Sequence, residues 1–215
     1  MKDIAIYVEG GGDTAQQKAE LRIGLDALLR PQKDAARAKR LGWRLAPTGG
    51  RQAAYEAFRA ALRRRGDDTL VVLLVDSETA IDPETKDEAV DAKMRVEHLS
   101  QHDGWSFENA DPRQVHLMVQ CMEAWIVSDA DALEAHYGKD FHASKLPVRP
   151  NLEEEPKGDV YTKLKNATRD TKKGEYAKIK HASKLLALID PAKVGHRCPR
   201  FVTFINWLTD VIGSA

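Results

Sequence analysis

The sequence predicts an α/β domain in which helices flank a central, mostly parallel sheet. Short apolar runs typical of strands alternate along the chain with amphipathic runs typical of helices, which is the order found in layered α/β domains. The run TLVVLLV at 69–75 is apolar at six successive positions, which is typical of a central strand buried on both faces of a parallel sheet. The chain has 215 residues, a length that suits one domain with a sizeable core.

Each element of the N-terminal part has a local signal. The run IAIYVE at 4–9 is rich in β-branched and aromatic residues and stops at three glycines, which indicates a strand and a tight turn. Asp13 or Thr14 is a candidate N-cap for the next helix, and Pro31 is expected to separate it from a second short helix. Gly66 is expected to end a third helix. The expected elements are strands at 4–9, within 43–50 and at 69–75, and helices at about 14–30, 31–40 and 51–65.

The C-terminal part is expected to be mostly helical. The sequence predicts helices at 89–103 and 121–138, the second with a break at Ser128 or Asp129, and a strand at 114–120 between them. Residues 139–175 hold three prolines and many lysines and are expected to be irregular, and two helices at 175–189 and 199–213 close the chain. We expect an α/β core at 1–138 and a C-terminal extension at 139–215 that packs on it as part of a single domain.

Composition limits the partners and the compartment. Lys plus Arg and Asp plus Glu are 33 each, so the net charge indicates no particular partner and a nucleic-acid surface would need local clustering. The two cysteines, Cys121 and Cys198, have no neighbour at metal-ligand spacing, which favours a reduced cytoplasmic protein. No secretory leader pattern and no apolar run of about 20 residues is found, so we expect no membrane partner.

Acidic residues follow the predicted strands at the edge where open α/β sheets bind ligands. Glu9 closes the first strand, Asp76 and Glu78 close the central one, and Glu123 comes after the strand at 114–120. On an extended chain Asp76 and Glu78 would lie about 6.5 Å apart on one face, where a divalent cation would turn their repulsion into attraction. Oxygen ligands of this kind suit Mg²⁺ or Mn²⁺. The alternative is a polar loop whose acids are solvated.

The glycine turn does not by itself indicate a nucleotide site. The sequence EGGGD at 9–13 fits neither of the glycine-rich phosphate-binding fingerprints of nucleotide-binding proteins. Its flanking acids would also repel a phosphate unless a metal intervened, so a plain tight turn is the simpler interpretation.

The order of these motifs resembles a known family. YVEGGGD, VVLLVDSE, HLMVQCMEAWIVSD, EYAKIKHASKLLALIDP and FVTFINWL follow one another as in the uncharacterised bacterial domain-of-unknown-function family 4276. That family is itself Toprim-like and similar to the RloB proteins and to the OLD-family Toprim nucleases. The resemblance covers nearly the whole chain and implies a Toprim-like three-layer domain with a C-terminal helical extension.

The resemblance implies roles for individual residues. Glu9 matches the Toprim glutamate, a general acid/base or second metal ligand, and Asp76 matches the first metal-binding Asp. Glu78 departs from the commoner Asp but still offers oxygens, and Glu123 would complete the metal shell. A catalytic lysine is expected late in the chain, with Lys178 and Lys180 as candidates.

The activity that the resemblance implies is cleavage of phosphodiesters with one or two Mg²⁺ or Mn²⁺ ions. It also implies a partner ATPase of the ABC/SMC-like type and a role in phage defence, which no residue pattern here indicates.

The segment 157–184 carries nine basic and three acidic residues, a local net charge of +6 in a chain of zero net charge. Such a segment can follow a nucleic-acid backbone, and Tyr161 and Tyr176 within it are candidates for stacking on bases. The alternative is a solvated surface. The candidate nucleic-acid-binding residues are Lys163, Lys165, Lys172 and Lys173.

Two other functions use the same residues. A non-catalytic regulatory subunit on a Toprim scaffold would explain the Glu at position 78 and the lack of an obvious nucleophile. A phosphatase or phosphotransferase for mononucleotides would use the same acids and metal. The short chain and the absence of a tyrosine-bearing cleavage domain argue against a topoisomerase, and a primase would need further domains.

Overall fold

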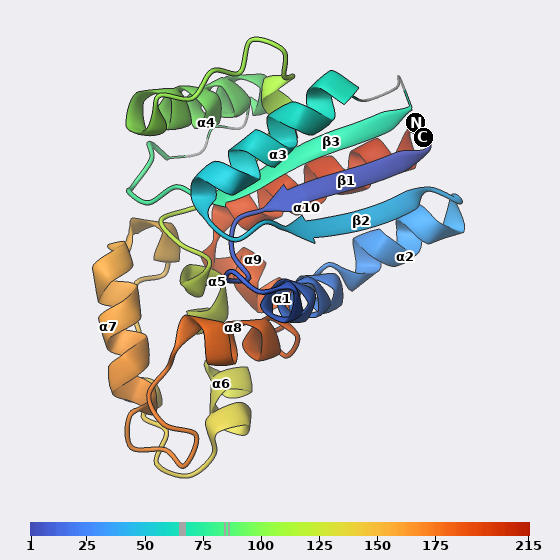
Figure 1. Cartoon of the computed structure of the whole chain (residues 1–215). Helices are drawn as coiled ribbons and strands as arrows, with labels where there is room; N and C mark the ends of the chain where they lie inside the picture. Colours follow the sequence, from blue (N-terminus) through green and yellow to red (C-terminus); the bar gives the residue numbers. More distant parts are fainter. Residues whose placement is uncertain (65–67, 84, 86) are drawn as a thin grey trace.

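The computed structural model describes residues 1–64, 68–83, 85 and 87–215. It has a four-stranded, all-parallel sheet in the order β2-β1-β3-β4, with helices on both faces (Figure 1). The predicted α/β class with a parallel sheet is therefore confirmed. The strands are β1 (Asp3–Val8), β2 (Gly42–Pro47), β3 (Thr69–Asp76) and β4 (Val115–Met118).

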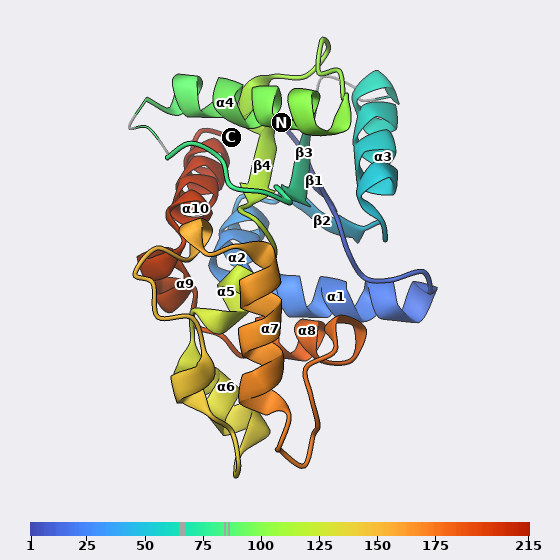
Figure 2. The same ribbon diagram turned by 90° about the vertical axis from the view of Figure 1, so that its left-hand side faces the viewer.

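The uninterrupted apolar run of β3 has the expected cause, because the sheet is covered on both faces. Alternate residues along β3 enter two separate cores, with Val72 and Leu74 on one face and Leu73 and Val75 on the other. Helices α1 (Ala15–Leu28), α2 (Arg30–Ala38) and α10 (Pro199–Gly213) cover the first face, and α3 (Arg51–Arg64) and α4 (Glu88–Asp103) cover the second (Figures 1 and 2).

The local signals of the N-terminal part are found in the structure. Thr14 caps α1 in a capping box with Gln17, and Pro31 lies in the first turn of α2. The glycine turn between β1 and α1 has positive φ at all three glycines, 118°, 90° and 63°, a conformation that other residues rarely adopt. The expected helix end at Gly66 lies outside the described residues.

The prediction of an irregular segment at 139–175 is wrong, because it contains helix α7 (Lys157–Thr168). Val160, Leu164 and Ala167 are buried at helical spacing, a signal that the flanking prolines and the lysines between them obscured. The strand predicted at 114–120 is shorter than expected, since it consists of β4 alone. The helix predicted at 175–189 is also shorter than expected, and a further helix follows it. The remaining helices are α5 (Glu123–Val127), α6 (Ala130–Tyr137), α8 (Lys178–Leu186) and α9 (Pro191–Arg197).

Helices α5 to α9 lie below the sheet in Figure 1, on the side of α1 and toward the carboxyl ends of the strands (Figures 1 and 2). Their buried apolar side chains belong to the same core as the first face of the sheet. Helix α8 packs against α1 so closely that a Cβ atom on Gly24 would collide with the carbonyl oxygen of Ser183. The break predicted in the helix at 121–138 is confirmed, since Asp129 caps α6 by accepting a hydrogen bond from Ala132 N at 3.1 Å.

A buried network of charges joins helices α4 and α10 to the segment before α7. We call it the arginine network, and its members are Asp91, Arg95, Glu153 and Arg200. Asp91 of α4 forms ion pairs with Arg95 through one carboxylate oxygen and with Arg200 of α10 at 2.9 Å through the other. Arg95 Nε donates to the carbonyl oxygen of Val115 at 2.7 Å, and Arg200 N donates to Glu153 at 2.7 Å. The network ties α10 to α4 beside strand β4.

Among the described residues, no helix combines the length and the apolar character needed to cross a lipid bilayer.

Candidate metal centre

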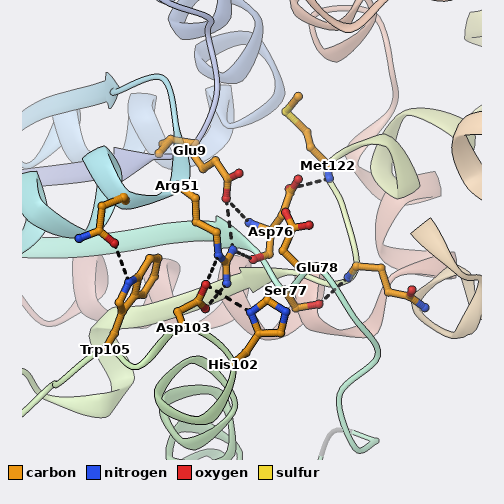
Figure 3. Close-up of polar contacts among 12 residues, drawn as sticks. Glu9, Arg51, Asp76, Ser77, Glu78, His102, Asp103, Trp105 and Met122 are labelled. Carbon is orange, nitrogen blue, oxygen red and sulfur yellow. Dashed lines mark hydrogen bonds and ion pairs between the residues drawn. The ribbon is translucent and has the colours of Figure 1, made fainter. Parts of the chain in front are cut away.

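Three acids meet at the carboxyl edge of the sheet: Glu9 after β1, Asp76 at the end of β3, and Glu78 two residues later (Figure 3). We call them the three-acid cluster. One carboxylate oxygen from each lies within 4.8 Å of the others. The Asp76 side chain is 1% exposed, and those of Glu9 and Glu78 are 14% and 29% exposed. The cluster is thus open to solvent on one side.

The extended geometry expected for residues 76–78 is wrong. Glu78 has a φ of 67°, in the left-handed region that non-glycine residues rarely occupy, so the chain turns immediately after the strand. The turn is held by Glu78 N, which donates to the carbonyl oxygen of Gln120 at 3.1 Å, and by Gln120 N, which donates to Ser77 Oγ at 2.6 Å. Backbone strain of this kind is often found at functional sites.

Gln120 itself joins three parts of the molecule. It has a φ of 56°, and its side chain accepts from Lys157 N at 3.0 Å and donates to the carbonyl oxygen of Glu153 at 3.0 Å. One buried residue therefore connects the loop that bears Glu78, the start of α7, and the arginine network.

Asp76 has one bonded and one unbonded oxygen. Oδ1 accepts from Met122 N at 2.9 Å, and the Asp76 N–H donates to Glu9 Oε2 at 3.1 Å. Oδ2 is buried and has no hydrogen-bond partner, although Lys178 and Lys157 Nζ lie 3.5 and 3.6 Å away. Burial raises the pKa of Asp76, and the two ammonium groups oppose that shift.

The three-acid cluster fits a hard divalent cation. All of its donors are carboxylate oxygens, the type that Mg²⁺ and Mn²⁺ prefer. Burial and the charge of Asp76 raise the pKa of Glu9 to about 7, although Arg51 and Lys178 oppose that shift. The unbonded Oδ2 of Asp76 offers a ready ligand atom. Glu9, Asp76 and Glu78 are the residues that would hold the ion.

Arg51 is a site residue that the sequence did not indicate. It begins α3 and forms two hydrogen bonds with the carboxylate of Asp103, at 2.7 and 2.5 Å. Its Nη1 donates to the carbonyl oxygen of Asp76 and lies 3.3 Å from Glu9 Oε2, and its guanidinium lies 5.0 Å from the centre of the Trp105 ring (Figure 3). Arg51 therefore fixes the position of Glu9.

Of the two candidate lysines, the structure places Lys178 in the site and Lys180 outside it. Lys178 Nζ lies 3.5 Å from both Asp76 Oδ2 and Glu123 Oε2, whereas Lys180 Nζ donates to the carbonyl oxygen of Lys173. Burial lowers the pKa of Lys178, but Asp76 and Glu123 outweigh burial and raise it above its usual value. Lys178 is therefore charged.

Lys157, the first residue of α7, also enters the site. Its Nζ lies 2.7 Å from Glu78 Oε1, and the nearby carboxylates outweigh burial and raise its pKa. The sequence indicated Lys157 only as part of the basic segment. Because helix α7 was not predicted, nothing indicated that its first residue would lie beside the acids.

Glu123 lies beside the three-acid cluster rather than in it. It is fully buried at the start of α5, and its Oε1 accepts a hydrogen bond from the Tyr176 hydroxyl at 2.8 Å. Its Oε2 has no hydrogen-bond partner and faces Lys178. The ammonium of Lys178 thus stands between Glu123 and Asp76.

The family described as domain of unknown function (DUF4276) matches residues 8–209, which include the whole acidic site. The chain belongs to this family. No curated protein and no solved structure matches the chain significantly.

In this member of the DUF4276 family, the basic segment is less exposed and less charged than its composition suggests. Lys163 pairs with Glu155, and Lys165 pairs with Glu175 at 3.4 Å. Lys172 and Lys173 are exposed, and neither forms an ion pair within the part of the chain that the structure describes. Tyr176 is buried, so the suggestion that it stacks on bases is wrong. Tyr161 is half-buried, and its hydroxyl lies 3.3 Å from Lys178 Nζ.

Proposed function

We propose that the protein is a Mg²⁺- or Mn²⁺-dependent nuclease that hydrolyses phosphodiesters. The observation that carries this proposal is the meeting of Glu9, Asp76 and Glu78 at the ligand-binding edge of a parallel sheet, with a buried, unbonded oxygen on Asp76. Such an oxygen lacks the hydrogen bond that buried polar atoms normally have, and metal ligation would supply its partner.

The residues around the cluster have distinct roles in this proposal. A bound divalent ion would polarise the phosphate and lower the pKa of a water molecule. Glu9 would be a ligand of that ion, together with Asp76 and Glu78. Arg51 orients Glu9, and Lys178 stabilises negative charge that develops on the phosphoryl oxygens.

The Toprim relationship is part of the proposal and is supported by motif order. A glutamate and a glycine turn after the first strand, then an acidic pair after the central hydrophobic strand, follow the pattern of the RloB and OLD-family nucleases. From the same resemblance we propose nucleic acid as substrate, an ABC/SMC-like ATPase as partner, and a role in phage defence. Lys172 and Lys173 are the exposed candidates for contact with the nucleic-acid backbone.

Metal binding is the first test, because a nuclease that acts with a partner can be silent when purified alone. We expect calorimetry to show Mn²⁺ binding to the wild type and to Asp34→Asn, a control at an exposed acid of α2. Asp76→Asn keeps the bond from Met122 N but loses a ligand charge, so affinity is expected to fall about 100-fold. Equal binding by folded Asp76→Asn would overturn the proposed metal centre.

Cleavage is then tested with labelled DNA and RNA strands and with a small phosphate ester, with and without Mn²⁺. Cleavage of a polymer by the wild type and not by Asp76→Asn supports the nuclease. Turnover of the ester alone would favour a mononucleotide phosphatase instead.

A regulatory subunit is the second candidate, and one observation favours it. Lys157 and Lys178 already neutralise much of the acidic charge, at 2.7 Å from Glu78 and 3.5 Å from Asp76. If the site were purely structural, the two lysines would remain paired with the acids and would take the place of a metal ion. No Mn²⁺ binding, combined with a stable complex with an ATPase, would be the result expected of a regulatory subunit.

A further inference from the structure

Lys178 lies at a position that a cation could fill. Its Nζ is 3.5 Å from Asp76 Oδ2 and 3.5 Å from Glu123 Oε2. Asp76 is 1% exposed and Glu123 is fully buried, and neither of these two oxygens has a hydrogen-bond partner. Two buried carboxylates this close to a common point need positive charge between them.

The surroundings of Lys178 hold its ammonium in place. It is the first residue of α8, and its Nζ lies within hydrogen-bonding distance, 3.3 Å, of the Tyr161 hydroxyl. Two residues earlier, Tyr176 is buried and bonds the other oxygen of Glu123. Helix α8 is in turn packed closely on α1 at Gly24. The backbone of Lys178 is therefore held by the packing of α8 on α1, and its ammonium is held by the Tyr161 hydroxyl and the two carboxylates.

Lys157 is placed differently. Its Nζ bonds Glu78 Oε1 at 2.7 Å, on the open side of the three-acid cluster, and Glu78 is the most exposed of the three acids. A metal ion bound by Asp76 and Glu78 would compete with Lys157 for the same oxygens. It would not need the oxygen of Glu123 that faces Lys178.

We propose that the ammonium of Lys178 occupies the place of a second metal ion, so that the centre binds one divalent ion and not two. This inference rests on the proposed function. Glu9, Asp76 and Glu78 hold the single divalent ion, and Asp76 is shared between that ion and the ammonium. A phosphodiester would then be bound through one phosphate group, with the ion and the ammonium of Lys178 supplying the two positive charges.

The test is the number of Mn²⁺ ions bound per chain, measured by equilibrium dialysis with metal analysis and by electron paramagnetic resonance. The wild type is expected to bind one. Lys178→Met removes the charge but keeps the length of the side chain, and is expected to bind two ions whose spectrum shows coupling between neighbouring Mn²⁺ centres. Lys178→Arg keeps the charge and is expected to bind one.

Lys180→Met is the matched control. It removes a lysine from the same helix, two residues away, whose ammonium bonds only the carbonyl oxygen of Lys173 among the contacts described. It is expected to bind one ion, as the wild type does.

The outcomes separate this inference from the proposed function. Two ions in the wild type, or one in a folded Lys178→Met, would overturn the role of Lys178 while leaving a metal-dependent nuclease in place. No bound ion in the wild type would overturn both. If Lys178→Met does not fold, the wild-type count decides, because two ions leave no place for the ammonium.

Discussion

Two clusters of opposite charges in the described part of the chain, the arginine network and the three-acid cluster with its lysines, differ in which buried atoms lack partners. In the arginine network both carboxylate oxygens of Asp91 are paired with arginines, and the unbonded atoms are nitrogens, Arg95 Nη2 and Arg200 Nε. Around the three-acid cluster the unbonded atoms are oxygens of Asp76 and Glu123. The first cluster has spare donors and the second has spare acceptors, so only the second calls for a further cation.

The comparison shows that burial and charge alone do not identify a functional site. Asp91 and Asp76 are 0% and 1% exposed, and both contact two cationic side chains. The difference lies in geometry: the arginines bond Asp91 directly, whereas both ammonium groups stay at 3.5 Å or more from Asp76 Oδ2. Direct pairing indicates a structural role, and looser pairing leaves the carboxylate available to a ligand.

The largest effect on the free energy of unfolding is expected from a substitution that breaks the arginine network. Asp91→Ala leaves two buried arginines without their shared partner and is expected to lower the free energy of unfolding by about 3–5 kcal/mol. Asp76→Asn is expected to change it by no more than about 1 kcal/mol, because the bond from Met122 N is kept and a desolvated charge is removed. Urea denaturation of both variants with a metal chelator measures the difference. Equal losses of stability would contradict the assignment of separate roles.

A pH series sharpens the comparison. The pKa of Glu9 rises from 4.5 to about 7 in the folded protein, so folding favours its protonated form. Glu9 therefore contributes stability that is complete below pH 4.5 and is lost as the pH rises to about 7, by up to about 3 kcal/mol.

The measurement is urea denaturation of the metal-free wild type and of Glu9→Gln across pH 4.5–7.5. Glu9→Gln cannot titrate, so its stability is expected to fall less over this range. Parallel pH profiles for the two proteins would show that Glu9 does not hold a proton in the folded state.

The smallest expected effect concerns Lys157. Because its ammonium bonds Glu78, Lys157→Met is expected to remove a competitor and to tighten Mn²⁺ binding about three- to fivefold, equivalent to up to about 1 kcal/mol. The count of bound ions should stay at one. Lys163→Met, on the same helix but paired with Glu155, is the control and should leave the affinity unchanged. Weaker binding in Lys157→Met would mean that this lysine supports the site instead of competing for it.

The sheet and its acids were accessible from the sequence because they depend on short stretches of chain. Six apolar residues in succession can only be a fully covered strand or a buried helix, and the flanking turns favoured the strand. Parallel strands end at one edge, so acids at the ends of β1 and β3 had to lie near one another.

The rest of the site depends on contacts between residues far apart in the chain. Arg51 is positioned by Asp103, 52 residues away, and nothing near either residue indicates the pair. The left-handed turn at Glu78 is set by the backbone of Gln120, so the spacing of Asp76 and Glu78 alone gave the wrong geometry. Helix α7 was not predicted because the prolines before it and its many lysines indicated an irregular segment.

Gln120 has a consequence for protein engineering. Its amide side chain bonds both the start of α7 and the backbone of Glu153, while its own backbone holds the loop at Glu78. One residue therefore contributes both to the packing of α7 and to the position of Glu78 in the three-acid cluster. A designer who wishes to move the acids, or to transfer them to another protein, has to keep Gln120 together with the four residues that it bonds: Ser77, Glu78, Glu153 and Lys157.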